Sequence, residues 1–164
     1  MNRVRFFLID ILINFIIIDL SKYKYKMENF IEAVVFTKGY SGYQHRNELV
    51  FMLKKNGIKI KKTAIMNFTD EQIREHYLNI AEKKEIFKDV CRMMKFFKHF
   101  VCIVEVPSID ILKNVVGEKT DPKACSEGTF RAMYGKNLTY NAAHRSGSEE
   151  DALREVAHFR QWLS

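Results

Sequence analysis

The sequence predicts an α+β domain in which four short strands form an antiparallel sheet with helices packed on it. Apolar or alternating segments at residues 30–37, 58–66 and 100–106 are each bounded by polar or glycine-containing residues. Longer segments between and after them place apolar residues at helical spacing. A chain of 164 residues with 47% hydrophobic and 29% charged residues can bury one substantial core. We therefore expect one main domain.

The first half of the domain begins with a strand and a helix. Residues 30–37 (FIEAVVFT) are apolar and β-branched with one polar break, which predicts a buried strand. The glycines of residues 39–42 predict a turn. Residues 44–56 place apolar side chains on one side and end before Gly57, which predicts a helix with a left-handed glycine cap. Residues 58–66 begin with alternating isoleucine and lysine and predict a half-exposed strand.

The middle of the chain predicts two helices followed by a strand. Thr69 and Gln72 have the spacing of a capping box, which predicts a helix that runs toward Tyr77. Residues 85–96 carry apolar side chains at helical spacing and predict a second helix. Residues 100–106 (FVCIVEV) predict the third strand.

The C-terminal part completes the pattern. Residues 109–116 predict a short helix closed by Gly117, and residues 118–128, which lack periodicity, predict a long ordered loop. A short strand is expected at residues 138–143, and a final helix is capped by Ser148. The resulting order is βαββαβ with additions, which is the ferredoxin-like arrangement.

The first 27 residues differ from the rest of the chain. Residues 6–20 (FFLIDILINFIIIDL) are strongly apolar, but a membrane-spanning helix needs roughly 20 residues and Asp10 and Asp19 interrupt this run. Basic residues precede it, as in a signal peptide, yet no small-residue cleavage site follows. We predict that residues 1–27 are an extension, loosely attached or upstream of the native start, and that residues 28–164 form the domain. The alternative interpretation of this extension is a membrane anchor, but a membrane partner is not the expected one.

Charge and cysteine content narrow the class of protein. The net charge of +7 favours anionic partners, which could be nucleotides, nucleic acid or an anionic membrane. The lysine runs are scattered and no RNA-binding aromatic strand pattern is visible, so specific nucleic-acid binding is not expected. The three cysteines, Cys91, Cys102 and Cys125, form no C-x-x-C pair, which indicates reduced thiols in a cytoplasmic protein and no structural zinc site.

Residues suited to phosphate chemistry gather in the C-terminal third. The segment N-A-A-H-R-S-G-S contains Asn141, His144 and Ser146, and Glu155 lies eleven residues after the histidine. The segment G-T-F-R ends in Arg131, which is expected to lie on a glycine-flanked turn. Histidine can act as a nucleophile when a neighbour orients its ring, and the guanidinium group matches phosphate oxygens. The combination favours chemistry on a phosphoryl group.

This part of the chain resembles the nucleoside diphosphate kinases. The family pattern runs G-x-T-x-P, then G-T-[IF]-R, then N-x-x-H-G-S-x-S, then a glutamate in the following helix. The chain has these four elements in the same order and at similar spacing: Thr120-Asp121-Pro122, Gly128 to Arg131, Asn141 to Ser148, and Glu155. The upstream E-H-Y at residues 75–77 also matches the family. The resemblance covers about residues 28–160 and is clearest over 117–159.

The resemblance implies a ping-pong phosphotransferase with a phosphohistidine on His144. Glu155 would hold the other ring nitrogen, Ser146 would donate a nearby hydrogen bond, and Lys38 would approach the transferring phosphoryl group. The implied nucleotide-binding residues are Arg131, Thr120, Asn141, Tyr77 and Phe87, the last matched only loosely to a base-stacking aromatic. Mg²⁺ would accompany the nucleotide, held by substrate and water rather than by a protein metal site. Nucleoside di- and triphosphates are the implied partners, and a homo-oligomer is a further option.

The chain also departs from the family pattern, and the departures leave two functions open. The first loop reads T-K-G-Y at residues 37–40 in place of K-P-D-G, and Arg145 replaces a glycine. An arginine there could crowd the site or add a phosphate contact. The segment 117–120 has one residue more than G-x-T, and the basic residue expected upstream falls on Lys113 or Asn114. The chain is therefore either a working kinase or a catalytically weak module that binds nucleotides or proteins.

Overall fold

The computed structural model describes residues 30–78 and 82–164. The predicted extension, residues 1–27, and its apolar run lie outside the described residues, so the domain boundary at residue 28 stays a prediction. Within the two described ranges, no helix combines the length and apolar character needed to cross a membrane.

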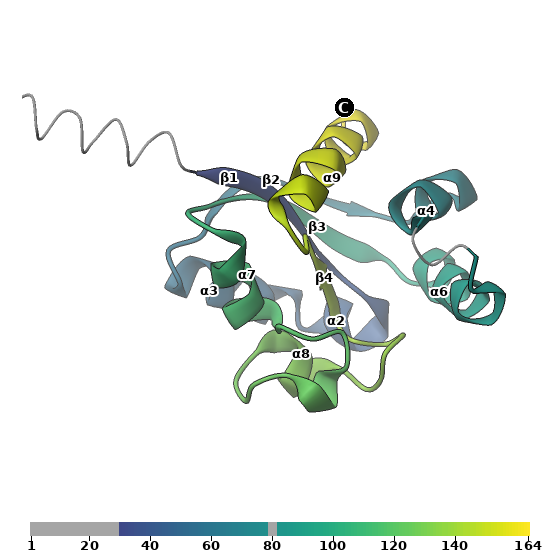
Figure 1. Cartoon of the computed structure of the whole chain (residues 1–164), viewed down its shortest axis with the longest axis horizontal. Coiled ribbons are helices and arrows are strands. Elements are labelled where there is room, and N and C mark those ends of the chain that lie inside the picture. Colours follow the sequence, from purple (N-terminus) through teal and green to yellow (C-terminus); the bar gives the residue numbers. More distant parts are fainter. Residues whose placement is uncertain (1–29, 79–81) are drawn as a thin grey trace, which may run out of the picture. The chain divides into compact units, whose positions relative to one another are not determined.

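An antiparallel four-stranded sheet forms the centre of the domain (Figure 1). β1 (Ile31–Thr37) pairs with β3 (His99–Val106) on one side and with β4 (Ala143–Arg145) on the other. β2 (Lys59–Met66) pairs with the outer side of β3. The strand order β2-β3-β1-β4 confirms the predicted ferredoxin-like fold class.

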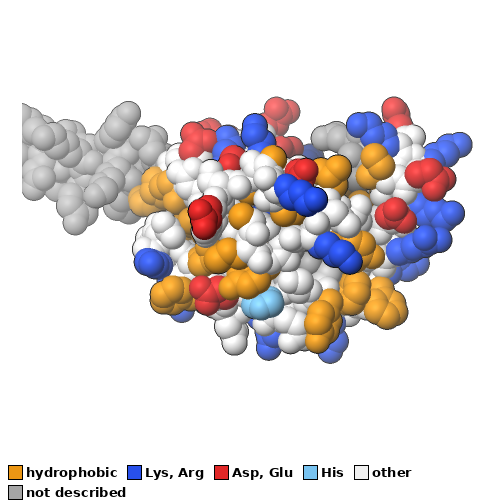
Figure 2. All heavy atoms as spheres, turned by 90° about the horizontal axis from the view of Figure 1, so that it is seen from below, with side chains coloured by type: hydrophobic (Ala, Val, Ile, Leu, Met, Phe, Trp, Pro, Cys, Tyr) orange, Lys and Arg blue, Asp and Glu red, His pale blue; other side chains and the backbone are white. Residues whose placement is uncertain are grey.

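Helices cover both faces of this sheet. They are α2 (Gly39–Gln44), α3 (Arg46–Lys55), α4 (Asp70–His76), α6 (Lys84–Phe96), α7 (Ile109–Val116), α8 (Phe130–Tyr134) and α9 (Glu149–Trp162), with a short 3-10 helix at Pro122–Ala124. Figure 2 shows Lys and Arg side chains gathered at the right-hand end of one face, the end at which Figure 1 places α4 and α6. The exposed cations of α6 are Lys84, Lys88, Arg92 and Lys95. They form the solvated face of a helix whose other face is buried.

β1 separates two apolar cores, because successive side chains of a strand point to opposite faces. Ala33 and Val35 lie in a core shared with α3 and α7. Val34 and Phe36 lie in a core shared with α4, α6 and α9, where Phe159 is fully buried. This alternation matters for the site, since it decides which face each residue paired with β1 points to.

The predicted caps are present. The Thr69 Oγ1 atom accepts a hydrogen bond from the backbone N–H of Gln72, and the Gln72 side chain accepts one from the backbone of Thr69, which completes the capping box. Gly57 has φ +73°, the left-handed conformation expected after a helix. The Ser148 hydroxyl accepts from the backbone N–H of Asp151 at the start of α9.

The predicted strand at residues 138–143 is wrong in its position. The strand is β4, Ala143–Arg145, and residues before it form a loop. The Asn137 side chain accepts from the backbone N–H groups of Thr139 and Tyr140, so a local side-chain turn replaces strand pairing there. The apolar residues of this stretch gave a strand-like pattern although Leu138 is 62% exposed.

Two segments predicted as turns are short helices. Residues 39–42 belong to α2, and an added Cβ at Gly42 would lie 2.0 Å from the backbone oxygen of Ala142. Glycine is needed there for close packing, although in the sequence it looks like a turn residue. Arg131 lies not on an irregular turn but in α8, which begins after Thr129, whose side chain accepts from the backbone N–H of Ala132.

Candidate active site

A polar cavity of about 470 Å³ lies beside β4 and the start of α9. It brings together five of the nine predicted site residues, from distant parts of the chain. Its lining consists of His76, Tyr77, Lys113, Glu118, Thr120, Arg131, His144, Arg145, Gly147, Asp151, Arg154 and Glu155. The predicted members among them are Tyr77, Thr120, Arg131, His144 and Glu155.

His144 is held at the cavity by three elements. Its place in β4 pairs it with Phe36 of β1, and the two rings stack with centroids 4.6 Å apart. Its Nε2 atom lies 3.1 Å from both carboxylate oxygens of Glu155 in α9. Its Nδ1 atom has no hydrogen bond within the described chain, and 17% of the side chain is exposed. The ring is therefore fixed through one nitrogen while the other stays available.

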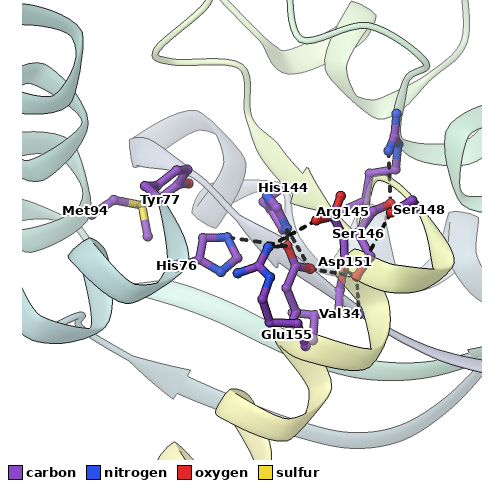
Figure 3. Close-up of polar contacts among 11 residues, drawn as sticks. Val34, His76, Tyr77, Met94, His144, Arg145, Ser146, Ser148, Asp151 and Glu155 are labelled. Carbon is purple, nitrogen blue, oxygen red and sulfur yellow. Dashed lines mark hydrogen bonds and ion pairs between the residues drawn. The ribbon is translucent and has the colours of Figure 1, made fainter. Parts of the chain in front are cut away.

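A chain of hydrogen bonds orients Glu155 from behind (Figure 3). The Ser146 hydroxyl donates to a Glu155 oxygen at 2.7 Å and accepts from the backbone N–H of Val34 at 3.0 Å. Ser146 and Glu155 are both buried, so these bonds are protected from water. Ser146 thus positions the carboxylate that positions the histidine, rather than lining the cavity itself.

The charges of this pair suit a nucleophilic histidine. Burial raises the pKa of Glu155, but the charge and hydrogen bond of His144 outweigh burial and hold the pKa below its usual range. Burial lowers the pKa of His144, although Glu155 opposes that shift. When the ring is neutral, the carboxylate beside Nε2 favours the tautomer that carries its proton on Nε2 and leaves Nδ1 unprotonated.

His76 lines the cavity, although it is not among the site residues predicted from the sequence. It is buried, its ring meets that of His144 edge-on at 4.5 Å, and its Nε2 atom lies 4.0 Å from Glu155. Its Nδ1 atom is buried without a partner among the described residues. Burial, then the nearby His144, lowers its pKa well below the usual value. The signal available in the sequence was its place next to Tyr77 in the E-H-Y match.

Arg131 supplies a buried cation at the cavity. Its Nε atom donates to the backbone oxygen of Ala143 at 2.9 Å, and its Nη1 atom donates to the oxygens of Gly117 and Lys119 at 3.3 and 2.8 Å. Its Nη2 atom has no hydrogen bond to the residues that the structure describes. A guanidinium held in this way has donors left over for an anion.

Lys38 lies next to the cavity rather than in its lining. The ammonium group is 5.6 Å from the centre of the Tyr77 ring, which does line it, and the backbone N–H of Lys38 donates to Ala142 at 2.7 Å. Burial, then the charge of Arg131, lowers the pKa of Lys38 to about 7. Of the two upstream candidates for a further cation, Lys113 lines the cavity and Asn114 does not.

Two predicted nucleotide-binding residues are placed differently. The Asn141 amide donates to the backbone oxygens of Thr120 and Leu138, and its buried Oδ1 atom has no partner in the described ranges. Phe87 lies in a separate groove, under the guanidinium of Arg74 at 5.9 Å. Asn141 therefore supports the loop that carries Thr120, whereas Phe87 does not line the histidine cavity.

Arg145 lies on the other side of β4 from His144. Its partner in β1 is Val35, which faces the α7 side of the sheet, whereas His144 pairs with Phe36. All three of its guanidinium nitrogens donate to backbone oxygens, those of Gly117, Ser146 and Glu118, at 3.0 to 3.2 Å. Because β4 is an edge strand, Arg145 still borders the cavity, but its hydrogen bonds run to backbone oxygens and not to the His144 ring.

This fold and this site define a class: ferredoxin-like α+β proteins with a carboxylate-held histidine in a cation-lined cavity suited to phosphate groups. The family model for nucleoside diphosphate kinase matches residues 42–161. The chain belongs to the nucleoside diphosphate kinase family.

Relatives are similar at low identity. A nucleoside diphosphate kinase of Bdellovibrio bacteriovorus is 31% identical over 68% of this chain and 79% of its own length. The solved structure of a family protein from Babesia bovis has 30% identity and a TM-score of 0.69, covering 77% of this chain and 86% of that one. A Halobacterium salinarum nucleoside diphosphate kinase in complex with CDP has 25% identity and a TM-score of 0.66, with 79% and 87% covered. These values fit a divergent member of the family.

Proposed function

We propose that this chain is an active nucleoside diphosphate kinase that transfers the γ-phosphoryl group of a nucleoside triphosphate to a nucleoside diphosphate through a phosphohistidine on His144. One observation carries the proposal. Nε2 of His144 is held by the buried carboxylate of Glu155, whereas Nδ1 is free of hydrogen bonds within the described chain and the ring borders a cation-lined cavity. An imidazole held in this way presents a lone pair on Nδ1.

The reaction would run in two half-steps. In the first, the Nδ1 lone pair of His144 forms a bond to the γ-phosphorus, and the bond from that phosphorus to the bridging oxygen breaks. A nucleoside diphosphate leaves with the electron pair. The Nε2 proton stays between the ring and Glu155, whose negative charge offsets the charge of the phosphorylated ring. In the second, a terminal oxygen of another nucleoside diphosphate attacks the phosphorus, and the P–N bond breaks.

The cations around the ring would stabilise the phosphoryl group in transit. Arg131 and Lys113 line the cavity with Tyr77 and His144, and the ammonium of Lys38 lies 5.6 Å from the centre of the Tyr77 ring. Phosphoryl transfer depends mainly on such fixed charges, because the charge develops on the equatorial and leaving oxygens. We infer that Arg131, Thr120 and Lys38 contact phosphates and that Asn141 acts by holding the Thr120 loop. A base contact by Phe87 stays a prediction of the resemblance.

Mg²⁺ fits this site as a cation carried by the nucleotide. The cavity has three carboxylates, but Glu155 is bonded to Ser146, Asp151 to Arg154 and Glu118 to Ser126. These carboxylates already have protein partners, and we infer that Mg²⁺ is held by the substrate phosphates and water. The ligand cluster that does occur in the described ranges, His76, His144 and Glu155, is rich in nitrogen, which magnesium does not favour. When bound, Mg²⁺ would neutralise phosphate charge.

The proposed partners are nucleoside di- and triphosphates. Two similar structures contain such ligands: the Halobacterium enzyme holds CDP, and a Borrelia burgdorferi enzyme of the same fold holds vanadate and ADP. The positive lining of the cavity favours the same substrate class here. A homo-oligomer and a cytoplasmic location stay predictions.

Incubation with γ-labelled ATP and Mg²⁺ tests the proposal. We expect a label on the protein that is lost in acid and kept in alkali, as a phosphohistidine is, and that transfers to an added nucleoside diphosphate. The measurement is label retained on the protein before and after the chase. Absence of label with ADP binding intact would contradict the kinase and favour the nucleotide-binding module.

The pH profile of kcat/KM should be bell-shaped, and Lys38 should set its alkaline side. The pKa of Lys38 is lowered to about 7, so its ammonium is lost as pH rises through about 7 in the free protein. The acid side of the profile is assigned to His144, because the ring is a nucleophile only when it is neutral. Burial lowers the pKa of this ring. Lys38→Arg should extend activity to higher pH, because arginine stays charged. An unchanged alkaline limb, with exposed Lys98→Arg as control, would contradict the assignment.

A further inference from the structure

Arg145 is tied to the loop that follows α7. Its Nε atom donates to the backbone oxygen of Gly117 at 3.2 Å and its Nη2 atom to that of Glu118 at 3.1 Å. Its Nη1 atom holds the next residue of its own strand end, through the backbone oxygen of Ser146 at 3.0 Å. Arg145 is only 8% exposed. Its bonds to Gly117 and Ser146 are buried and that to Glu118 is partly buried, so they are largely shielded from water. Arg145 therefore links the end of β4 to the loop.

Arg131 holds the same loop from a second direction. It shares the Gly117 oxygen with Arg145 and also binds the oxygen of Lys119 at 2.8 Å. Three consecutive backbone oxygens, 117 to 119, thus face two guanidinium groups. Two buried like charges repel each other, and such an arrangement persists only where hydrogen bonds offset the cost. The carbonyl dipoles of this loop supply those bonds.

The loop connects two residues of the cavity. Lys113 lies one turn before Gly117 in α7, and Thr120 follows the three bonded carbonyls. Gly117 itself has φ +126°, and an added Cβ would lie 3.0 Å from the Arg131 side chain. The loop conformation therefore depends on contacts with the arginines, and it fixes the separation of Lys113 and Thr120.

Two departures from the family pattern meet at these bonds. The segment 117–120 has one residue more than the G-x-T of the family, and Arg145 stands where the family has glycine. A longer loop presents one more backbone oxygen that needs a partner. Arg145 reaches that stretch from the neighbouring strand, where a glycine has no side chain to offer.

We propose that Arg145 is a positioning residue that holds the 117–119 loop in place and compensates for the extra residue in that segment. In this way it places Lys113 and Thr120 at the phosphate end of the nucleotide. This effect on turnover rests on the proposed kinase function, whereas the brace itself does not. Arg145 acts through the loop, not through contact with the transferring group.

Four variants and two readouts test the brace. Arg145→Gly restores the family residue. Arg145→Lys keeps the charge but lacks the planar guanidinium whose three nitrogens bond three separate carbonyls. Deletion of Lys119 restores the family loop length and is made alone and together with Arg145→Gly. Hydrogen exchange of peptides covering residues 117–129, read by mass spectrometry, reports the loop without reference to activity. Steady-state kinetics reports KM and kcat, and exposed Arg92→Ala serves as the matched arginine control.

The brace predicts that both single Arg145 variants speed exchange in residues 117–129 and not in the sheet, and raise KM for the nucleotide by about tenfold with a smaller change in kcat. The pH profile should keep its shape, because the His144–Glu155 pair is untouched. The double variant should recover KM to within about threefold of the parent, since a shorter loop needs no brace. The exchange measurement tests the brace even if the unmodified protein shows no phosphotransfer, because it does not depend on activity.

Three outcomes would overturn the brace. Higher activity in Arg145→Gly would show that the arginine crowds the site. Full activity with unchanged loop exchange in Arg145→Lys would show that only the charge matters. If the KM and exchange defects of the double variant equal the sum of those of the two single changes, the loop length and Arg145 act independently.

Discussion

Replacing His144 with alanine is expected to remove the protein-bound label completely and to lower kcat by about 10⁴-fold or more, because the proposed nucleophile of the first half-reaction, which also carries the phosphoryl group into the second, is lost. The fold should tolerate the change. His144 is partly exposed, and its backbone pairing with Phe36 does not depend on the side chain. The measurement is nucleoside triphosphate formed per second, together with the label retained on the protein and circular dichroism of both proteins.

His45→Ala is the matched control for this variant. His45 is exposed, stacks on Tyr134 with ring centroids 4.0 Å apart, and does not line the histidine cavity. It should keep the parent label and turnover. Label that persists in His144→Ala would place the phosphoryl group elsewhere, and His76, whose ring lies 4.5 Å from that of His144, would be the first residue to examine.

Most of the fold could be predicted from the sequence because its signals are local. The capping box at Thr69, the glycine cap at Gly57 and the alternation of residues 58–66 each depend on a few neighbouring residues. The predicted elements were wrong where a tertiary contact decides the conformation. Gly42 packs against Ala142, which no local pattern reveals. The strand β4 is three residues long and is defined by its pairing with β1 rather than by its own apolar pattern.

The site, like the fold, could be predicted where its signals are local and could not where tertiary contacts decide. The spacing from His144 to Glu155 predicted that the two lie on neighbouring elements, and the structure places the Nε2 atom of His144 3.1 Å from a carboxylate oxygen of Glu155. The burial of His76 beside them depends on where α4 packs, which the sequence does not state. The role of Arg145 depends on the path of a loop 27 residues away. The sequence identifies the substitution but does not distinguish a side chain that crowds the site from one turned toward the opposite face of the strand.

Glu155→Gln is expected to lower kcat by about 10² to 10³-fold while the protein stays folded. Glutamine keeps the size of the side chain and can still accept from Ser146, but it removes the negative charge that fixes the Nε2 proton of His144 and offsets the phosphorylated ring. Because Glu155 raises the pKa of His144 against the effect of burial, its loss should lower that pKa further. The acid limb of the kcat/KM profile should therefore move to lower pH.

The stability of this variant should change with pH in a defined direction. The pKa of Glu155 is lowered in the folded protein, so the group stabilises the fold above its unfolded pKa, near 4.5, and this stabilisation is lost as pH falls. The parent should lose stability on acidification more steeply than Glu155→Gln, as measured by urea unfolding between neutral and acid pH. Exposed Glu150→Gln in the first turn of the same helix is the matched control. A Glu155→Gln protein with parent turnover and an unmoved acid limb would show that this carboxylate does not orient His144.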